Sequence, residues 1–293
     1  MWWASKQQPP QLPHTGPELL SLAAALALYA LATLVRGERW WRLLVDEGGT
    51  PSRADSLGIT CVGYAGNNIL PARAGDAIRA VLMAPRAGTS VRTVVGTLLA
   101  ERILDVAVLV VLFVVVGYGL LGQVEAGRAE LVAGIVVALG ILALIGWRIA
   151  RRSQRLHDFL APIAASTLGL RRAHHGLRLL ALTLLIWAIE TGVWMSVAGA
   201  IGFGVNVIEG VYLVALASVF SMIPSGPAYA GTQDAAAIIG LKALGSTGAQ
   251  AVAFIVMLRF VIVVPITIVG LVLMASRYGG LRRLRTFGTG ATA

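Results

Sequence analysis

Long apolar stretches separated by short, arginine-rich segments dominate the chain. A helix that crosses about 30 Å of hydrocarbon needs roughly 20 residues. Five stretches come close to or exceed that length, at residues 17–35, 94–121, 131–147, 177–201 and 251–276. The pattern predicts an all-α integral membrane protein with about five transmembrane helices. The polar residues before the first stretch favour a short tail over a cleaved leader.

Two further apolar segments are shorter and interrupted by helix breakers. Residues 54–70 contain several glycines and end in two asparagines, and residues 208–223 run into Pro-Ser-Gly-Pro. A second short helical stretch follows each segment, at 72–83 and 232–244. We interpret both as re-entrant helical hairpins, because broken backbone at membrane depth is tolerated only where it lines a cavity or is covered by protein. The alternative is one short, tilted span in each place.

The positive charges fix a predicted orientation. The net charge is +10, and arginines cluster after the first, third and last predicted spans, which the positive-inside rule places in the cytoplasm. In this interpretation Arg36, Arg39 and Arg42 lie in a cytoplasmic loop, where Trp40 and Trp41 serve as interfacial anchors. We therefore predict a multi-pass protein of the inner (cell) membrane of a bacterium or archaeon, with the N-terminus outside and the C-terminus in the cytoplasm.

The chain is interpreted as one membrane domain, residues 1–293. It consists of an extracytoplasmic tail at 1–16, two units at 54–121 and 208–276 that each join a hairpin to the following span, and a cytoplasmic tail at 277–293. Under the predicted topology the two units have opposite orientations. Paired broken helices in inverted halves indicate a transporter with a site near the middle of the membrane.

The two units are similar in detail as well. Each hairpin contains a Pro/Gly break followed by an acidic residue, Asp76 or Asp234, and each following span carries an arginine, Arg102 or Arg259, at nearly the same distance along the chain. This similarity predicts an inverted repeat.

Charged residues within the predicted spans are candidate site residues. Glu101 and Asp105 lie on one helix face, and each charge at the centre of a membrane helix costs at least about 2.5 kcal/mol, so such residues normally face the bundle interior and pair. The three carboxylates, including Glu190, are either structural partners of Arg102 and Arg259 or direct ligand contacts. The arginines favour ligand binding, because a guanidinium matches phosphate with two parallel hydrogen bonds.

The first hairpin adds further candidates. Asn67 and Asn68 either bind headgroup oxygens or cap a helix, and Arg73 and Arg79 either bind phosphate or anchor the hairpin by their charge. The predicted substrate-binding residues are Asn67, Asn68, Arg73, Asp76, Arg79, Glu101, Arg102, Asp105, Glu190, Asp234 and Arg259.

Several classes of function are disfavoured by composition. The single cysteine, Cys61, excludes an internal disulfide, and the sequence shows no local metal-ligand spacing and no Walker motif. Nucleic-acid binding is disfavoured because the positive residues lie between apolar runs. We predict no metal, no cofactor and no catalytic residue.

In combination, these motifs resemble the lysylphosphatidylglycerol synthase transmembrane, or flippase-like, family. The resemblance rests on RGERWWRLL, NNILPARAGDAIRA, ERILD, WAIE, PAYAGTQDA, and LRF followed by Pro265 and Gly270, and it spans nearly the whole chain. It implies a membrane module that moves aminoacylated phosphatidylglycerol between leaflets in bifunctional relatives, and other lipids or polyprenyl-linked glycolipids in stand-alone members. The residues that it implies coincide with those chosen above.

The chain departs from the family pattern in three respects. We find no soluble aminoacyltransferase domain, so lysyl transfer is not expected, and the additional N-terminal span that is usual in the family is not seen. Ala228 stands where relatives commonly carry Gly, and Asp234 where many carry Glu.

We therefore expect a protein that is not an enzyme and that moves a phospholipid or polyprenyl-linked glycolipid across the inner membrane through a polar cavity between the hairpins. The partner is a membrane lipid, with a homo-oligomer or a lipid-biosynthetic enzyme as possible protein partners. One alternative is a membrane-embedded transferase acting on a lipid phosphate, with Asp76 or Glu101 as base. Another is an accessory subunit of a lipid-modifying enzyme.

Overall fold

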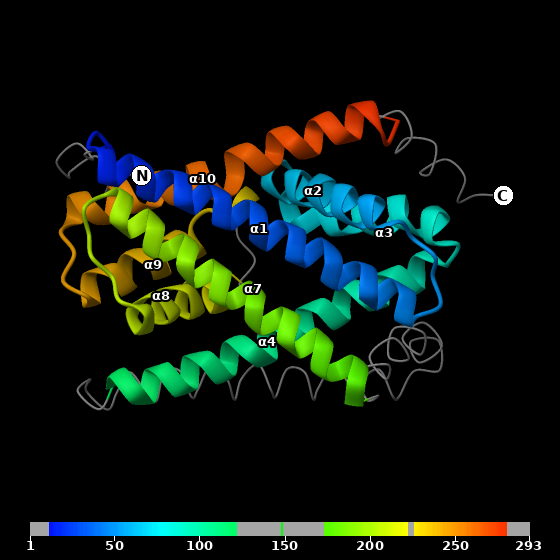
Figure 1. Cartoon of the computed structure of the whole chain (residues 1–293), viewed down its shortest axis with the longest axis horizontal. Coiled ribbons are helices and arrows are strands. Elements are labelled where there is room, and N and C mark those ends of the chain that lie inside the picture. The colour runs from blue at the N-terminus through cyan, green and yellow to red at the C-terminus, as the bar shows by residue number, and fades with distance from the viewer. Residues whose placement is uncertain (1–11, 122–147, 149–172, 222–225, 280–293) are drawn as a thin grey trace.

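A computed structural model describes residues 12–121, 148, 173–221 and 226–279. These residues form eight α-helices and two 3-10 helices and no strand, which confirms the all-α prediction (Figure 1). The elements are α1 (Gly16–Asp46), α2 (Arg53–Ile69), η2 (Pro71–Arg73), α3 (Ala74–Ala87), α4 (Val91–Leu121), α7 (Ala173–Ala200), α8 (Val207–Phe220), η4 (Pro227–Tyr229), α9 (Thr232–Ala243) and α10 (Gly248–Ser276). The span predicted at 131–147 lies outside the described residues.

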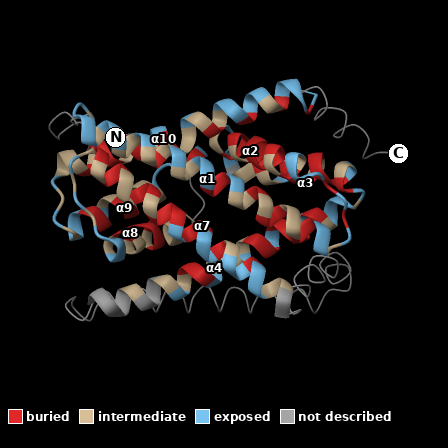
Figure 2. Cartoon of the chain, viewed as in Figure 1, coloured by how far each residue is buried: buried red, intermediate tan, exposed pale blue. Residues whose placement is uncertain are grey.

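Four long helices, α1, α4, α7 and α10, run along the long axis of the molecule (Figure 1). By length and composition α1, α7 from His175 onward, and α10 can each cross a membrane. Their outer faces are apolar, with Leu20, Ile268 and Val272 all more than half exposed, while buried residues concentrate where helices face one another (Figure 2). Continuous exposed apolar faces mark contact with lipid or a partner, and together with the lengths they support the predicted membrane protein.

Helix α1 is longer than predicted. A capping box between Thr15 and Glu18 begins it, and it continues past Val35 to Asp46. The prediction that Arg36, Arg39 and Arg42 lie in a loop was therefore wrong. No proline interrupts this segment, so the helix continues for as long as its polar residues find partners in the bundle.

Trp40 was also interpreted incorrectly, as an interfacial anchor. Its side chain is fully buried, and its indole Nε1 donates a hydrogen bond to Thr97 Oγ1 of α4 at 3.1 Å. The residue therefore belongs to the packing between α1 and α4.

The first predicted hairpin is formed by α2 and α3. The backbone N–H of Thr50, before α2, donates to the carbonyl oxygen of Ala87, at the end of α3, at 3.0 Å. The chain therefore returns to the end of the molecule from which it started, as a hairpin does and a tilted span does not. The two helices touch closely, because a Cβ at Gly75 would collide with the carbonyl oxygen of Gly63.

The second hairpin, α8 and α9, lies in the opposite half of the long axis from α2 and α3 (Figure 1). The two tips meet: the Arg73 guanidinium donates to the carbonyl oxygen of Ser221, at the end of α8, at 3.3 Å. Each tip contains a 3-10 turn within a Pro-Ala-x-Ala-Gly sequence, and each places a non-glycine residue, Arg73 (φ 55°) or Ala228 (φ 54°), in the left-handed region. The hairpins thus share one plan and enter from opposite ends.

One end of the molecule gathers the segments that were predicted to be cytoplasmic. The carboxylate of Asp55 lies 3.2 Å from Arg277 and 3.8 Å from Arg86, and Asp46 lies 2.7 Å from His175. The loop after α1, the end of α3, the start of α7 and the segment after α10 therefore lie together. Which compartment this end faces, and which membrane holds the protein, stay predictions.

Candidate functional site

A polar cavity of about 290 Å³ lies where the two hairpin tips meet. The first hairpin contributes Asn67 and Arg73 to its lining, and the second contributes Ser221 and Ala228. Helices α1, α4, α7 and α10 complete the wall. Its charged lining residues are five arginines and three carboxylates, namely Arg36, Arg39, Arg73, Arg79, Arg102, Glu101, Asp105 and Glu190.

The cavity brings together most of the residues predicted to bind substrate. Eight of them line it: Asn67, Asn68, Arg73, Arg79, Glu101, Arg102, Asp105 and Glu190. Asp76 does not line the cavity but contacts residues that do, and Asp234 and Arg259 pair with each other beside the second hairpin. Contact with a ligand stays a prediction for all eleven.

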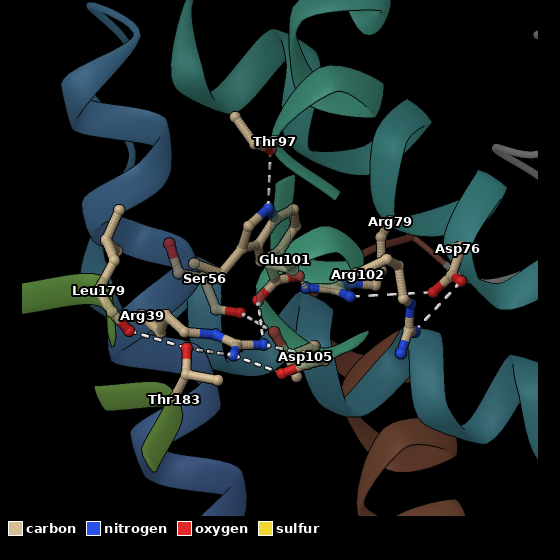
Figure 3. Close-up of polar contacts among 12 residues, drawn as sticks. Arg39, Ser56, Asp76, Arg79, Thr97, Glu101, Arg102, Asp105, Leu179 and Thr183 are labelled. Atoms are coloured by element: carbon tan, nitrogen blue, oxygen red, sulfur yellow. Dashed lines mark hydrogen bonds and ion pairs between the residues drawn. The ribbon is translucent and has the colours of Figure 1, made fainter. Parts of the chain in front are cut away.

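The most buried part of the charge network is centred on Glu101 (Figure 3). One carboxylate oxygen of Glu101 accepts a hydrogen bond from Arg79 at 2.9 Å, and the other lies 3.6 Å from Arg39. The guanidinium of Arg79 stacks on the ring of Trp40 at 4.1 Å. Arg79 and Glu101 are almost completely buried, so this pair joins α3 to α4 as part of the core.

Arg39 neutralises the second carboxylate of α4. Its guanidinium donates two hydrogen bonds to Asp105, at 2.6 and 3.1 Å, and one to Thr183 of α7 at 3.0 Å. Nearby, Arg36 lies 2.6 Å from Glu190 of α7. These pairs hold α1 against α4 and α7 at the level of the cavity.

Sequence reasoning did not include Arg36 and Arg39 among the site residues. One of its two interpretations of Glu101, Asp105 and Glu190 named Arg102 and Arg259 as their partners, whereas the closest contacts to these carboxylates come from Arg79, Arg39 and Arg36. The arginine cluster after the apolar run was taken as a loop signal. The available signal was helical spacing, because Arg36 and Arg39 are three residues apart and therefore on one helix face.

Arg102 is held less tightly than its neighbours. Its guanidinium lies 3.4 Å from Asp76, and its side chain is 37% exposed, against 2% for Arg39 and 3% for Arg79. Charge-assisted hydrogen bonds between nitrogen and oxygen are typically about 2.7–2.9 Å long. Arg102 is therefore the most exposed of the ion-paired arginines that line the cavity, and its contact with Asp76 is longer than such a bond usually is.

The second hairpin has a corresponding acid–arginine pair, Asp234 and Arg259, with shorter contacts. Arg259 donates to both carboxylate oxygens of Asp234, at 2.7 and 2.8 Å, and to the carbonyl oxygen of Ala228 at 3.0 Å. The spacing along the chain is 25 residues here and 26 residues for Asp76 and Arg102. The matched distances in the sequence thus correspond to matched ion pairs, one at each hairpin.

The asparagines of the first hairpin make tertiary contacts instead of capping α3, whose N-terminus has no side-chain cap. Asn67 Nδ2 donates to Asp76 Oδ1 at 3.3 Å, and Asn68 Nδ2 donates to Thr267 Oγ1 of α10 at 2.9 Å. They hold the tip of the first hairpin beside α3 and α10.

The excess of arginine over carboxylate suits an anion. Desolvated guanidinium groups bind phosphate strongly and with defined geometry. Within the described part of the chain, no group of three or more His, Cys, Asp or Glu side chains is placed to hold a metal ion.

Comparison with known proteins gives one family and one relative. The family model described as lysylphosphatidylglycerol synthase TM region matches residues 1–270. Glycosyltransferase AglD of Haloferax volcanii is 23% identical over 85% of this chain. The match covers 47% of the relative, so the chain spans about half its length. No solved structure matches the chain significantly.

The family match confirms the resemblance seen in the sequence and supports a role related to membrane lipids. The expectation that the chain is not an enzyme is corrected, because a protein of related sequence is named as a glycosyltransferase. No catalytic motif was recognised in the amino-acid sequence to suggest this. The lipid ligand and any protein partner stay predictions.

Proposed function

This chain belongs to the family of the lysylphosphatidylglycerol synthase TM region, and from that premise we propose that it binds a lipid phosphate between its hairpins and moves the headgroup across the membrane. The observation that carries the proposal is the cavity at the meeting point of the tips, with five arginines against three carboxylates. A charge in hydrocarbon is costly, whereas a polar cavity enclosed by protein replaces the lost hydration.

Arg102 is the proposed phosphate ligand. It lines the cavity, is the most exposed of the paired arginines there, and has a long contact with Asp76. A phosphate oxygen can take the place of the Asp76 carboxylate and form the shorter, bidentate contacts that guanidinium favours. Arg39 and Arg79 both contact the buried carboxylate of Glu101, which holds them in place. They therefore provide positive charge around the ligand. The acyl chains remain in the bilayer throughout.

Movement of the headgroup requires the cavity to open towards each side in turn. The hairpins enter from opposite ends (Figure 1). The first is joined to the long helix that follows it by the pairs Asp76–Arg102 and Arg79–Glu101, and the second by the pair Asp234–Arg259. Loosening the contacts of one hairpin at a time exposes the cavity to one side while the other hairpin stays closed. This corresponds to the rocking of inverted repeats around a central site.

The binding step is tested by native mass spectrometry of the gently extracted protein. We expect co-purified phosphate-bearing lipid on the wild type and a loss of about ten-fold in occupancy for Arg102→Gln, since one charge-assisted hydrogen bond contributes roughly 1.5–3 kcal/mol. Arg53→Gln is the matched control, because Arg53 is 66% exposed and lies outside the cavity. Equal occupancy in both variants would remove Arg102 from the site.

A second proposed function is glycosyl transfer involving a lipid phosphate, favoured by the relative that is named as a glycosyltransferase. In such a step the bond between the sugar's anomeric carbon and the phosphate oxygen breaks, and a bond to an acceptor hydroxyl forms. The acceptor's proton passes to a carboxylate. Asp76 suits this role better than Glu101, because Asp76 is 26% exposed and Glu101 is buried between Arg39 and Arg79.

The two functions differ in whether the lipid changes mass. Purified protein would be incubated with a glycosyl lipid phosphate and an acceptor alcohol, and the products would be examined by mass spectrometry. A new glycoside formed by the wild type and absent with Asp76→Asn supports transfer. Unchanged lipid that has moved between leaflets supports translocation.

A further inference from the structure

Tyr64 lies on the part of α2 that faces the cavity. It precedes Asn67 and Asn68 by one helical turn, and all three residues line the cavity. From this face of α2 the side chain of Asn67 reaches Asp76, which in turn contacts Arg102. Tyr64 therefore belongs to the same side of the cavity as Arg102, the proposed phosphate ligand.

The hydroxyl of Tyr64 is reachable from the cavity. Tyr64 is only partly buried, and its hydroxyl is not closed off from solvent in the way that the indole nitrogen of Trp187 is. Within the described part of the chain, this hydroxyl makes no hydrogen bond. Tyrosine hydroxyls in protein interiors usually have a hydrogen-bond partner, so a ligand atom in the cavity is a suitable partner for this one.

The charges around the hydroxyl favour an anionic partner. Those with the largest electrostatic effect on it are three arginines and one carboxylate, namely Arg36, Arg79, Arg102 and Glu101. The carboxylate of Glu101 is itself hydrogen-bonded to Arg79. Among cations a hydroxyl keeps its oxygen towards the positive charges and its proton towards an acceptor. An acceptor that also satisfies the arginines is an anion such as phosphate.

We propose that Tyr64 is a second ligand of the lipid phosphate, donating its O–H to a phosphate oxygen while the guanidinium of Arg102 binds the same phosphate. This rests on the proposed phosphate site and adds a neutral donor to it from the first hairpin. The bound phosphate then bridges α2 and α4, and it replaces the contact of Asp76 with Arg102 between α3 and α4.

The test measures binding of phosphatidic acid and of diacylglycerol with the same acyl chains to the protein in maltoside micelles. The wild type is expected to prefer phosphatidic acid, and Tyr64→Phe is expected to weaken its binding roughly five-fold, the range of one hydrogen bond. Diacylglycerol, which lacks the phosphate, should bind both proteins equally. The midpoint of thermal unfolding should not change in Tyr64→Phe, because the hydroxyl has no partner within the described residues.

The matched control is Tyr278→Phe. It removes a hydroxyl that lies 3.4 Å from Asp55, outside the cavity, and it should leave the binding of phosphatidic acid unchanged. A free phosphate ion offers the same oxygens as the lipid, so inorganic phosphate is titrated against bound phosphatidic acid. Displacement at equal concentrations would overturn the lipid as the source of the phosphate, whereas retention of the lipid supports it.

A double variant tests whether both side chains bind the same phosphate. Contacts to one group are coupled, so the loss in Tyr64→Phe with Arg102→Gln should be smaller than the product of the single losses. A loss equal to that product, unchanged binding in Tyr64→Phe, or weaker binding with a lower unfolding midpoint would each overturn the role of Tyr64 while the Arg102 site stands. If the wild type binds phosphatidic acid no better than diacylglycerol, the phosphate site itself fails.

Discussion

At the scale of single residues, burial separates the arginines into two groups. Arg39 and Arg79 are 2–3% exposed and hold carboxylates at 2.6–2.9 Å, whereas Arg102 is 37% exposed with a contact of 3.4 Å. Removing one partner of a buried ion pair leaves an uncompensated charge. The first group therefore maintains the fold, whereas Arg102, the more exposed arginine, is the one that we propose to contact a ligand.

This division predicts a large effect on stability at Arg39. Arg39→Gln should destabilise the protein by about 3–5 kcal/mol, because Asp105, whose side chain is only 15% exposed, would lose its closest partner. Thermal unfolding in detergent measures the change. Adding Asp105→Asn removes the uncompensated charge and should recover part of the loss. Full stability of the single variant would contradict a structural role for Arg39.

Ala228, at the tip of the second hairpin, has a left-handed backbone conformation. Replacing it with glycine is expected to stabilise the protein. Ala228 has φ 54°, a conformation that costs an L residue roughly 1–2 kcal/mol and glycine little. Ala228→Gly should therefore raise the free energy of unfolding by about 1 kcal/mol. Ala230→Gly is the matched control, since Ala230 has φ −60° and should lose stability. A loss in both variants would show that the strain is absent.

The sequence predicted which residues belong to the charge network better than it predicted which of them form ion pairs. Charges within apolar runs must pair, so Glu101 and Asp105 were recognisable as members of a network. Their partners Arg79 and Arg39 come from other helices, and only the packing of those helices determines which arginine reaches which carboxylate. The nearly equal spacing of Asp76 and Arg102, and of Asp234 and Arg259, was the one sequence signal that matched ion pairs.

At the scale of elements, the hairpins were predictable and the end of α1 was not. Proline and glycine mark both hairpin breaks directly in the sequence, and the observed helices α2, α3, α8 and α9 lie close to the predicted ranges. Helix α1 carries arginines past its apolar run, and a charge signal alone does not distinguish a loop from a polar helical turn inside a bundle.

The close contact within the first hairpin gives a test at this scale. Gly75→Ala should destabilise the protein by about 1–3 kcal/mol, because the new Cβ has no room against the carbonyl oxygen of Gly63. Gly204→Ala is the control, since a Cβ there meets no atom within 4 Å. Thermal unfolding compares the two. Equal stability would mean that α2 and α3 are not packed in this way.

At the scale of the whole molecule, the two hairpins divide the long axis between them and meet at its centre (Figure 1). Arginine clusters after the first, third and last spans were predicted to share one side, and the loop after α1, the start of α7 and the segment after α10 lie together at one end. Opposite entry of the two hairpins is the property on which translocation depends, because a site reached from one side only cannot transfer a headgroup.

This arrangement predicts opposite sidedness for two loops. In a Cys61→Ala background, Thr50→Cys before the first hairpin and Gly204→Cys before the second should react with a membrane-impermeant maleimide added to opposite faces of the membrane. Both positions are exposed, so a lack of reaction from one face is informative. Labelling of both from the same face would contradict the inverted arrangement.

Headgroup movement in liposomes tests the proposed function most directly. Protein would be reconstituted in vesicles containing a fluorescent phosphate-bearing lipid, and the fraction of lipid that becomes accessible to an external quencher would be followed over time. We expect the wild type and Arg53→Gln to move the lipid far faster than protein-free vesicles, and Arg102→Gln to be slower by about ten-fold or more. Wild-type vesicles that match protein-free ones, or an undiminished rate in Arg102→Gln, would contradict transfer through this cavity.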